Sequence, residues 1–498
     1  MFAMRRWTVC LTPLIFTALA VGVVPASAVP VAQPDWGSCQ AWLGDTSDLP
    51  AARCATVPVP VDYSKPDGAQ AQLAVIKIPA TGKRVGALMI NPGGPGQSAV
   101  DVVASMATSF GDNEITQHFD LVGFDPRGVG HSTPEVRCRT DAEFDAYRRE
   151  PLVDYSPAGV AHIENLYRGY AQECLDKVGA EFLANVGTVN VARDMDVVRQ
   201  ALGESQVNYL GFSYGTQLGT VYAQAFPQNV RAMVLDGAVD PQLDAVEKSV
   251  RQMAGFQRAF DDFAAECASQ TGCPLGQDPA KATDAFHSLV NPLVTHPGAT
   301  LDPRGLSYQD AITGTVNSLY TPRYWDFLFN GLNALAHGTE AEELLLLADD
   351  YQGRDKNGQY TNLQDAFTAV RCVDYVSPKD SAPWVDADRR IRQVAPFMSY
   401  GQFTGFAPRD VCAFWPVPPT TAPHTATSLG PNKVVVVSTT HDPATPYQAG
   451  VDLARQLGAA LITFEGTQHT AVFKGNQCID GAVVNYLVDL TPPGDLHC

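Results

Sequence analysis

The chain has 498 residues, of which 45% are hydrophobic, and its formal net charge is −19 at pH 7. Such an acidic chain is a poor ligand for nucleic acid and for anionic membrane surfaces, because both bind proteins through basic clusters. The length and the hydrophobic content are sufficient for a large core, and α/β architectures of this size often form one unit. We therefore expect a globular protein with no nucleic-acid partner.

The first 28 residues have the pattern of a secretory signal peptide. Arg5 and Arg6 precede an apolar stretch at 7–24, and Ala-Ser-Ala at 26–28 is a small-residue cleavage site. Cleavage after Ala28 removes two arginines and no acids, so the formal charge changes from −19 to −21. No later stretch approaches the ~20 apolar residues that a membrane span requires. We expect a secreted, extracellular protein, with cell-wall association as an alternative location.

Cysteine content agrees with export. Removal of the predicted signal peptide takes away Cys10 and leaves an even number, namely Cys39, Cys54, Cys138, Cys174, Cys267, Cys273, Cys372, Cys412, Cys478 and Cys498. In an oxidising compartment these cysteines are expected to pair completely. Connectivity is not determined by the sequence, and our working hypothesis pairs sequence neighbours, ending with Cys478 and Cys498. Because no motif has zinc-ligand spacing, we expect no metal and no other cofactor.

The first candidate loop follows an apolar run at 87–90, which predicts a strand. Residues 91–98 are rich in Gly and Pro, and glycine lets a backbone N–H approach a substrate closely. For acyl transfer we expect the Gly94 N–H to be one oxyanion donor, with Gly93 as the alternative. A plain turn is the competing interpretation.

The second candidate loop contains Gly-Phe-Ser-Tyr-Gly at 211–215. It lies between an apolar run at 207–210 and a helix-like stretch at 216–225. This strand, turn and helix context is that of a nucleophile elbow, in which the serine sits on a strained turn. We predict that Ser213 is a nucleophile and that the Tyr214 N–H is the other oxyanion donor; an ordinary glycine-flanked loop is the alternative.

The pattern changes after residue 240. Region 241–400 has helical periodicity and lacks β-branched strand runs. We expect an α/β core with a mostly parallel sheet, built from 29–240 and 401–498, and a helical cap inserted over 241–400. Such a cap would shape the substrate pocket and exclude large folded proteins.

The C-terminal quarter supplies a base and an acid. Asp442 follows the β-branched run at 434–437, and His469 follows a strand-like run at 460–464. Loops at the carboxyl ends of parallel strands meet at one edge of a sheet. We therefore predict a triad in the order Ser, Asp, His, with Asp236 as the alternative acid.

The histidine next to the predicted acid is a competitor for the role of base. His441 lies downstream of Ser213, as His469 does. Two triad members on neighbouring residues of one loop would point in different directions, which favours His469. The competing interpretations are a satisfied loop histidine for His469 and a capping or turn residue for Asp442.

Four segments together carry a resemblance: Asn-Pro-Gly-Gly-Pro-Gly at 91–96, Phe-Asp-Pro-Arg-Gly at 124–128, the elbow at 211–215, and Asp-Pro-Ala-Thr-Pro-Tyr at 442–447. From about Trp36 to the C-terminus the chain resembles the secreted tripeptidyl aminopeptidases of actinobacteria. These belong with the prolyl aminopeptidase-like serine peptidases of the α/β-hydrolase fold.

The resemblance implies a triad of Ser213, Asp442 and His469 and the removal of short peptides, in particular tripeptides, from free N-termini. Pro92 stands where prolyl aminopeptidases usually have histidine, which argues against strict release of proline. Asp374 lies in a segment that resembles the family's cap and is the candidate for binding the substrate ammonium. The hydroxyl of Thr445 is expected to support the acid loop.

The sequence therefore predicts a secreted, cofactor-independent serine exopeptidase acting on peptides with a free N-terminus, with no obligate protein partner. An esterase or lipase with the same triad is the first alternative, because acyl-transfer machinery serves esters and amides alike. A secreted, non-catalytic binding protein on the same fold is the second.

Overall fold

The computed structural model describes residues 33–430 and 432–498. Residues 32–498 form one compact unit. The predicted signal peptide at 1–28 lies outside the described residues.

A nine-stranded sheet has the order β1-β2-β4-β3-β5-β6-β7-β8-β9. β2 pairs antiparallel with β1 and β4, whereas the pairs from β4–β3 to β8–β9 are parallel. The strands are β1 (Arg53–Pro60), β2 (Gln70–Ile78), β3 (Gly86–Asn91), β4 (Phe119–Phe124), β5 (Val207–Phe212), β6 (Val230–Asp236), β7 (Val434–Thr439), β8 (Ala460–Phe464) and β9 (Leu496–His497). The predicted fold class, α/β with a mostly parallel sheet, is confirmed.

The central strands are buried along their whole length. Every residue of β3, β4, β5 and β7 is buried, including the valine run of β7. Strands enclosed on both faces favour continuous apolar runs over alternation. The helices of this α/β part are α1 (Gln40–Leu43), α2 (Ala99–Phe110), α3 (Glu114–His118), α7 (Thr188–Ala201), α8 (Tyr214–Ala225), α16 (Tyr447–Leu457) and α17 (Gln477–Asp489).

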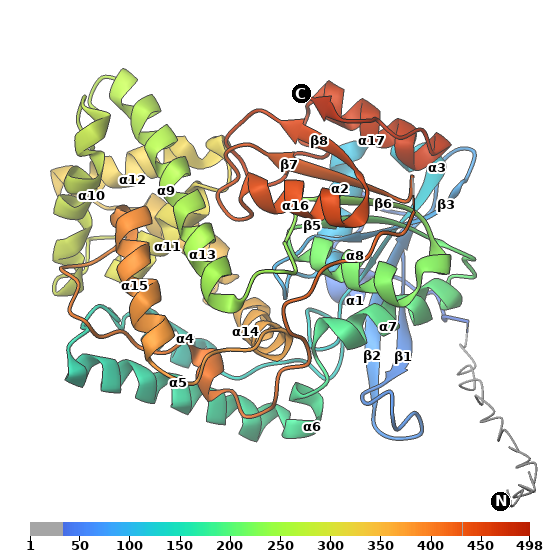
Figure 1. The fold of residues 1–498 in the computed structure, drawn as a ribbon, viewed down its shortest axis with the longest axis horizontal. Coiled ribbons are helices and arrows are strands. Elements are labelled where there is room, and N and C mark those ends of the chain that lie inside the picture. Colours follow the sequence, from blue (N-terminus) through green and yellow to red (C-terminus); the bar gives the residue numbers. More distant parts are fainter. Residues whose placement is uncertain (1–32, 431) are drawn as a thin grey trace, which may run out of the picture. The chain divides into compact units, whose positions relative to one another are not determined.

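Between β6 and β7 the named elements that the structure describes are all helices. The α-helices are α9 (Ala245–Ser269), α10 (Ala282–Val290), α11 (Tyr308–Ser318), α12 (Trp325–His337), α13 (Glu342–Gln352), α14 (Leu363–Asp374) and α15 (Ala382–Val394). Many of them share an apolar cluster that includes Phe260, Phe263, Phe286 and Trp325, and Figure 1 shows α9–α13 gathered together. We propose that α9–α15, which fall within 241–400, are the predicted cap.

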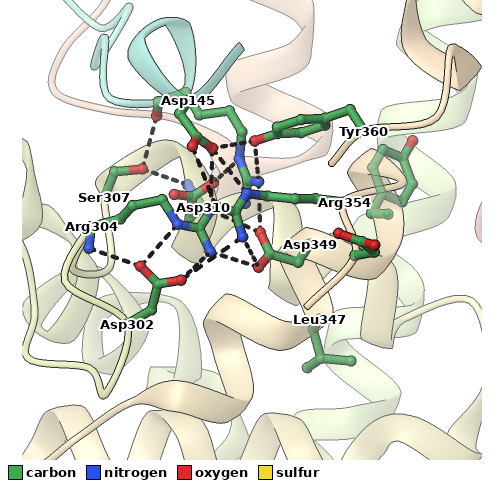
Figure 2. A network of polar contacts seen from close by, with 12 residues as sticks. Asp145, Asp302, Arg304, Ser307, Asp310, Leu347, Asp349, Arg354 and Tyr360 are labelled. Atoms are coloured by element: carbon green, nitrogen blue, oxygen red, sulfur yellow. Dashed lines mark hydrogen bonds and ion pairs between the residues drawn. The ribbon is translucent and has the colours of Figure 1, made fainter. Parts of the chain in front are cut away.

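A buried ionic network connects these helices to α4 (Asp141–Arg148), which precedes α5 (Pro157–Val178) and α6 (Ala180–Leu183). The Arg148 guanidinium donates to Asp310 of α11 at 2.7 Å and to Asp349 of α13 at 2.6 Å. In Figure 2 the side chains of Arg304 and Arg354 lie among several carboxylates of the same network. Helix α4 belongs to the segment predicted as core, and its ion pairs lead us to propose that it belongs with the cap.

Five disulfides join the cysteines in sequential pairs: Cys39–Cys54, Cys138–Cys174, Cys267–Cys273, Cys372–Cys412 and Cys478–Cys498. The working hypothesis of neighbour pairing is thereby confirmed. Among the helices of the described residues, none has the length and apolar character needed to cross a membrane.

Candidate active site

Ser213 occupies the turn between β5 and α8. Its backbone has φ +53° and ψ −120°, a sparsely populated conformation for a residue with a Cβ atom. The flanking glycines allow close packing, since a Cβ on Gly211 would lie 2.4 Å from the carbonyl oxygen of Gly215. A Cβ on Gly215 would in turn lie 2.7 Å from the carbonyl oxygen of Asn91. The turn is therefore built as an elbow that holds the serine in a strained backbone.

His469 and Asp442 form a hydrogen-bonded pair. The imidazole Nδ1 lies 2.9 and 3.0 Å from the two carboxylate oxygens of Asp442. The same carboxylate accepts the backbone N–H groups of Ala444 at 2.9 Å and Thr445 at 2.7 Å. Since Nδ1–H donates to a buried carboxylate, Nε2 is the ring nitrogen left as a proton acceptor. Loops after β7 and β8 supply these two residues, as the strand order requires.

Two further groups hold the imidazole. The Thr445 hydroxyl oxygen lies 3.3 Å from Nδ1 of His469. Tyr320, which follows α11, makes two contacts with His469. Its carbonyl oxygen accepts the His469 backbone N–H at 2.8 Å, and its ring packs edge-on against the imidazole with 5.4 Å between the ring centroids. The helical region between β6 and β7 therefore helps to position the histidine.

Asp236, the alternative acid, lies behind the histidine loop. One of its carboxylate oxygens accepts the backbone N–H groups of Ala471 and Val472, both at 2.8 Å. Burial raises the pKa of Asp236 to about 6. Its neighbour Gly237 packs against the imidazole, where an added Cβ would lie 3.1 Å from Cε1 of His469. Asp442, rather than Asp236, makes the hydrogen bond to the imidazole.

The competitor His441 is engaged elsewhere. Its Nδ1 lies 2.7 Å from a carboxylate oxygen of Asp262 on α9, which also accepts from the Thr467 hydroxyl at 2.6 Å. His441 therefore fastens the acid loop to α9.

The glycine loop lies against the elbow, since a Cβ on Gly93 would lie 3.0 Å from the Cβ of Ser213. The Gly93 N–H donates to the side-chain oxygen of Asn91 at 3.1 Å and is thus occupied. For the Gly94 N–H no acceptor is found among the described residues. Tyr214 is the first residue of α8, where a backbone N–H has no partner within the helix. Gly94 and Tyr214 are accordingly the better candidates for oxyanion donors.

A cavity of about 280 Å³ opens at the serine. The elbow, the glycine loop, α9 and α14 contribute to its lining, with residues such as Gly94, Ser213, Lys248, Gln252, Arg371 and Asp410. A second cavity of about 320 Å³ shares Phe367, Arg371 and Asp410 with the first. The cavity next to Ser213 is therefore a candidate substrate-binding site.

Comparison with known proteins agrees with this geometry. Residues 86–476 match the model of the α/β hydrolase fold family. The chain belongs to this family. It is 64% identical over 478 residues to carboxylesterase B of Mycobacterium tuberculosis, covering 96% of this chain and 92% of the relative.

Two further relatives of this α/β hydrolase are peptidases by name. Serine protease Hip1 of M. tuberculosis is 50% identical over 516 residues and covers 99% of both chains. Tripeptidyl aminopeptidase of Streptomyces lividans is 34% identical over 477 residues, covering 93% of this chain and 86% of the relative. The chain is thus a hydrolase of the same family as these serine peptidases.

The Asp-Pro-Arg-Gly turn of this α/β hydrolase has structural contacts. The buried carboxylate of Asp125 accepts the backbone N–H of Val100 at 3.0 Å and that of His131 at 2.8 Å. The buried guanidinium of Arg127 makes two hydrogen bonds to Asp194, at 2.7 and 2.6 Å. The turn stabilises the core and contributes no side chain to the cavity lining.

The predicted ammonium ligand, Asp374, lies in the cavity wall and is only 1% exposed. Its carboxylate accepts the Thr188 backbone N–H at 2.7 Å, the Thr188 hydroxyl, and the Gln217 amide at 3.1 Å. Burial raises its pKa to about 6. The carboxylate is therefore largely occupied by protein donors.

Asp410 is a more accessible carboxylate that sequence reasoning did not single out. Its side chain is 24% exposed and pairs with Arg371 at 3.0 Å, and both residues line the cavity. The Cys372–Cys412 disulfide holds their two segments together. In the sequence, Asp410 could have been noticed because it lies two residues before Cys412. That position points to the cavity only once Cys412 is known to pair with Cys372.

Proposed function

We propose that the chain is a secreted serine exopeptidase that releases short peptides, in particular tripeptides, from free N-termini. The observation that carries this proposal is the His469–Asp442 hydrogen bond beside a serine held on an elbow, with carboxylates in the adjoining cavity. The names of two relatives, a serine protease and a tripeptidyl aminopeptidase, support a peptide substrate.

In the acylation step, Ser213 Oγ attacks the scissile carbonyl carbon while Nε2 of His469 takes its proton. Asp442 stabilises the imidazolium through the Nδ1–H bond at 2.9 Å. The N–H groups of Gly94 and Tyr214 stabilise the oxyanion. His469 then donates its proton to the departing amine, which leaves an acyl-enzyme.

Water completes the cycle. His469 removes a proton from the water that attacks the acyl carbonyl, and it returns this proton to Ser213 Oγ as the ester bond breaks. Apart from the attacking water, these steps use side chains and backbone N–H groups of the chain.

The substrate's N-terminus is proposed to bind at the side of the cavity where Arg371 of α14 pairs with Asp410. Asp410 is exposed enough to accept a hydrogen bond from the substrate ammonium, and such charge-assisted bonds are stronger than neutral ones. Asp374 adds negative charge to the cavity wall, but its oxygens already accept hydrogen bonds from Thr188 and Gln217. In this proposal the closed end of the cavity limits how many residues fit between the substrate's N-terminus and the scissile bond.

Export is part of the proposal. Five disulfides in the described residues suit an oxidising compartment, where such bonds form and persist. The signal-peptide pattern at 1–28 agrees with an extracellular location.

Ester hydrolysis is the second candidate function. The 64% identical relative is named carboxylesterase B, and the cavity wall includes apolar Val239, Phe367 and Ala444. The same triad attacks an ester carbonyl in the same way, so the substrate preference depends on the cavity rather than on the triad.

The test uses matched peptides, one set with a free N-terminus and one acetylated, with the mature protein and its Ser213→Ala variant. Product masses that show tripeptides from the free set alone, and none with the variant, would support the proposal. Hydrolysis of simple esters without cleavage of either peptide set would establish the esterase instead. If an active-site phosphonate fails to label Ser213, the chain is a binding protein on a hydrolase fold.

A further inference from the structure

Helix α9 presents one face to the cavity at Ser213. Ala245, Lys248, Ser249 and Gln252 all line it, and their spacing of three, four and seven residues places them on one helix face. Lys248 thus shares a cavity with Ser213, although the proposed chemistry does not use it.

The ammonium group of Lys248 has no ion-pair partner among the described residues. No carboxylate oxygen of the described residues lies within 4.0 Å of its Nζ, whereas charges withdrawn from water are normally paired. Its hydrogen-bond partner in the protein is the hydroxyl of Tyr375 at 2.5 Å, and an ammonium has three donors. Lys248 also lies in the first turn of α9, where the helix dipole disfavours a cation. The ammonium also lies 4.2 Å from the centroid of the Tyr375 ring, so one aromatic residue provides both of its contacts.

Hydrogen bonds orient the groups around this ammonium. The Tyr375 hydroxyl donates to the side-chain oxygen of Gln217, whose amide donates to Asp374 at 3.1 Å. The Tyr375 oxygen is therefore free to accept from Lys248, and Tyr375 remains next to the cavity. Asp374, at the end of this chain, is 1% exposed and already bonded by three protein donors. Both residues line the cavity, but the Asp374 side chain is buried whereas Lys248 is partly exposed.

The charge of Lys248 persists at neutral pH. Burial lowers its pKa to about 8, with Asp374 opposing and Arg371 adding to this effect. The Arg371 guanidinium, the other cation in the cavity lining, is paired with Asp410. Of the two cations in this lining, Lys248 is therefore the one without a carboxylate partner among the described residues.

We propose that Lys248 is a specificity residue that binds a carboxylate in the acyl part of the substrate, that is, an aspartate or glutamate side chain among the N-terminal residues released. This inference rests on the proposed exopeptidase function. In this arrangement the substrate ammonium binds near Asp410, and an acidic side chain of the substrate binds near Lys248 on α9.

The test compares peptides with a free N-terminus that differ only by Glu, Gln or Lys at one of the first three positions. For the wild-type protein we expect kcat/KM at one position to favour Glu over Gln by on the order of ten- to a hundredfold. Lys248→Met should bring this ratio close to one, and Lys248→Arg should retain much of it. Lys248→Glu should invert the preference toward the Lys peptide, because the charge is reversed.

Lys281→Met is the matched control, since that side chain is 77% exposed and does not line the cavity. It should keep the wild-type ratio. Equal rates for Glu and Gln peptides at all three positions, with efficient cleavage of both, would overturn the inference and leave the exopeptidase proposal intact. A wild-type preference that survives in Lys248→Met and Lys248→Glu would also overturn it.

Failure of the exopeptidase proposal has a different result, namely no peptide cleavage and Ser213-dependent hydrolysis of esters. The same variants are then compared on two esters whose acyl chains end in a carboxylate or in its neutral amide. A Lys248-dependent preference for the carboxylate supports the cation's role, and equal rates overturn it.

Discussion

The backbone N–H of Ser213 donates to the backbone carbonyl of Asp236 at 2.9 Å. The side chain of Asp236 meanwhile supports the loop that carries His469, through the N–H groups of Ala471 and Val472. One residue at the end of β6 thus contacts both the serine turn and the histidine loop. This arrangement separates two roles for carboxylates in the site: Asp442 bonds the imidazole, and Asp236 supports the backbone around it.

The two carboxylates should respond differently to neutralisation. Asp442→Asn is expected to lower kcat by about 10⁴-fold, because the amide no longer stabilises the imidazolium or selects the required tautomer. Asp236→Asn should reduce kcat by less than about tenfold, because an amide oxygen can still accept from the backbone. Steady-state kinetics on one peptide measures both. A larger loss for Asp236→Asn than for Asp442→Asn would assign the orienting role to Asp236.

Strain at the elbow predicts a gain in stability when the side chain is removed. Ser213 has φ +53°, which glycine adopts without the Cβ penalty of about 1–2 kcal/mol. Ser213→Gly should therefore raise the thermal unfolding temperature relative to Ser213→Ala, and both variants should be inactive. Differential scanning calorimetry of the two variants makes the comparison. A lower temperature for the glycine variant would mean that the fold does not hold this turn under strain.

Thr445 is expected to act through the imidazole. Its hydroxyl lies 3.3 Å from Nδ1 of His469, while its backbone N–H bonds Asp442. Thr445→Val should lower kcat about fivefold with little change in KM, since a weak hydrogen bond contributes roughly 1 kcal/mol. Thr445→Ser keeps the hydroxyl and should restore most of the rate. Unchanged turnover in the valine variant removes the support role.

The raised pKa of Asp236 makes a prediction for stability as a function of pH. A carboxyl group whose pKa is about 6 in the folded state, above the ordinary 3.8, binds its proton more tightly when folded. Its contribution to the free energy of unfolding therefore falls as pH rises from about 4 to about 6, by on the order of 1–3 kcal/mol. Asp236→Asn lacks this term.

The stability of Asp236→Asn relative to wild type should thus increase between pH 4 and 6 and level off above. Urea unfolding at several pH values provides the measurement. Asp125 and Asp374, whose pKa values are also about 6, remain in both proteins and cancel in the difference. Asp67→Asn, at an exposed position, is the control. Parallel stability curves for wild type and Asp236→Asn would contradict the prediction.

The buried network around Arg148 should be sensitive to the loss of its cation. Arg148→Met leaves Asp310 buried without its arginine partner, whereas Asp349 keeps Arg304 at 2.7 Å. Breaking a buried pair in this way destabilises by about 3–5 kcal/mol. The midpoint of urea unfolding measures the effect. Arg168→Met, which removes a 46% exposed guanidinium from Glu164, should change stability by less than about 1 kcal/mol.

The sequence by itself was enough to predict the fold class and the order of the candidate site residues along the chain. Apolar runs of β3, β5, β7 and β8 mark the parallel strands, and loops that follow parallel strands meet at one edge for topological reasons. This local information placed Ser213, Asp442 and His469 on loops at that edge. Their roles stay predictions until the variants are measured.

Only the tertiary structure decided what surrounds these residues. Three features depend on contacts between distant segments: the pairing of Arg371 with Asp410, the occupied carboxylate of Asp374, and the contact of the Lys248 ammonium with Tyr375 instead of a carboxylate of the described residues. Such contacts produce no periodic pattern in the sequence, because the sequence around a single charged helix residue does not differ between a residue that faces solvent and one that faces a cavity. The strength of a charge depends on its burial and its partners, and these are properties of the folded chain.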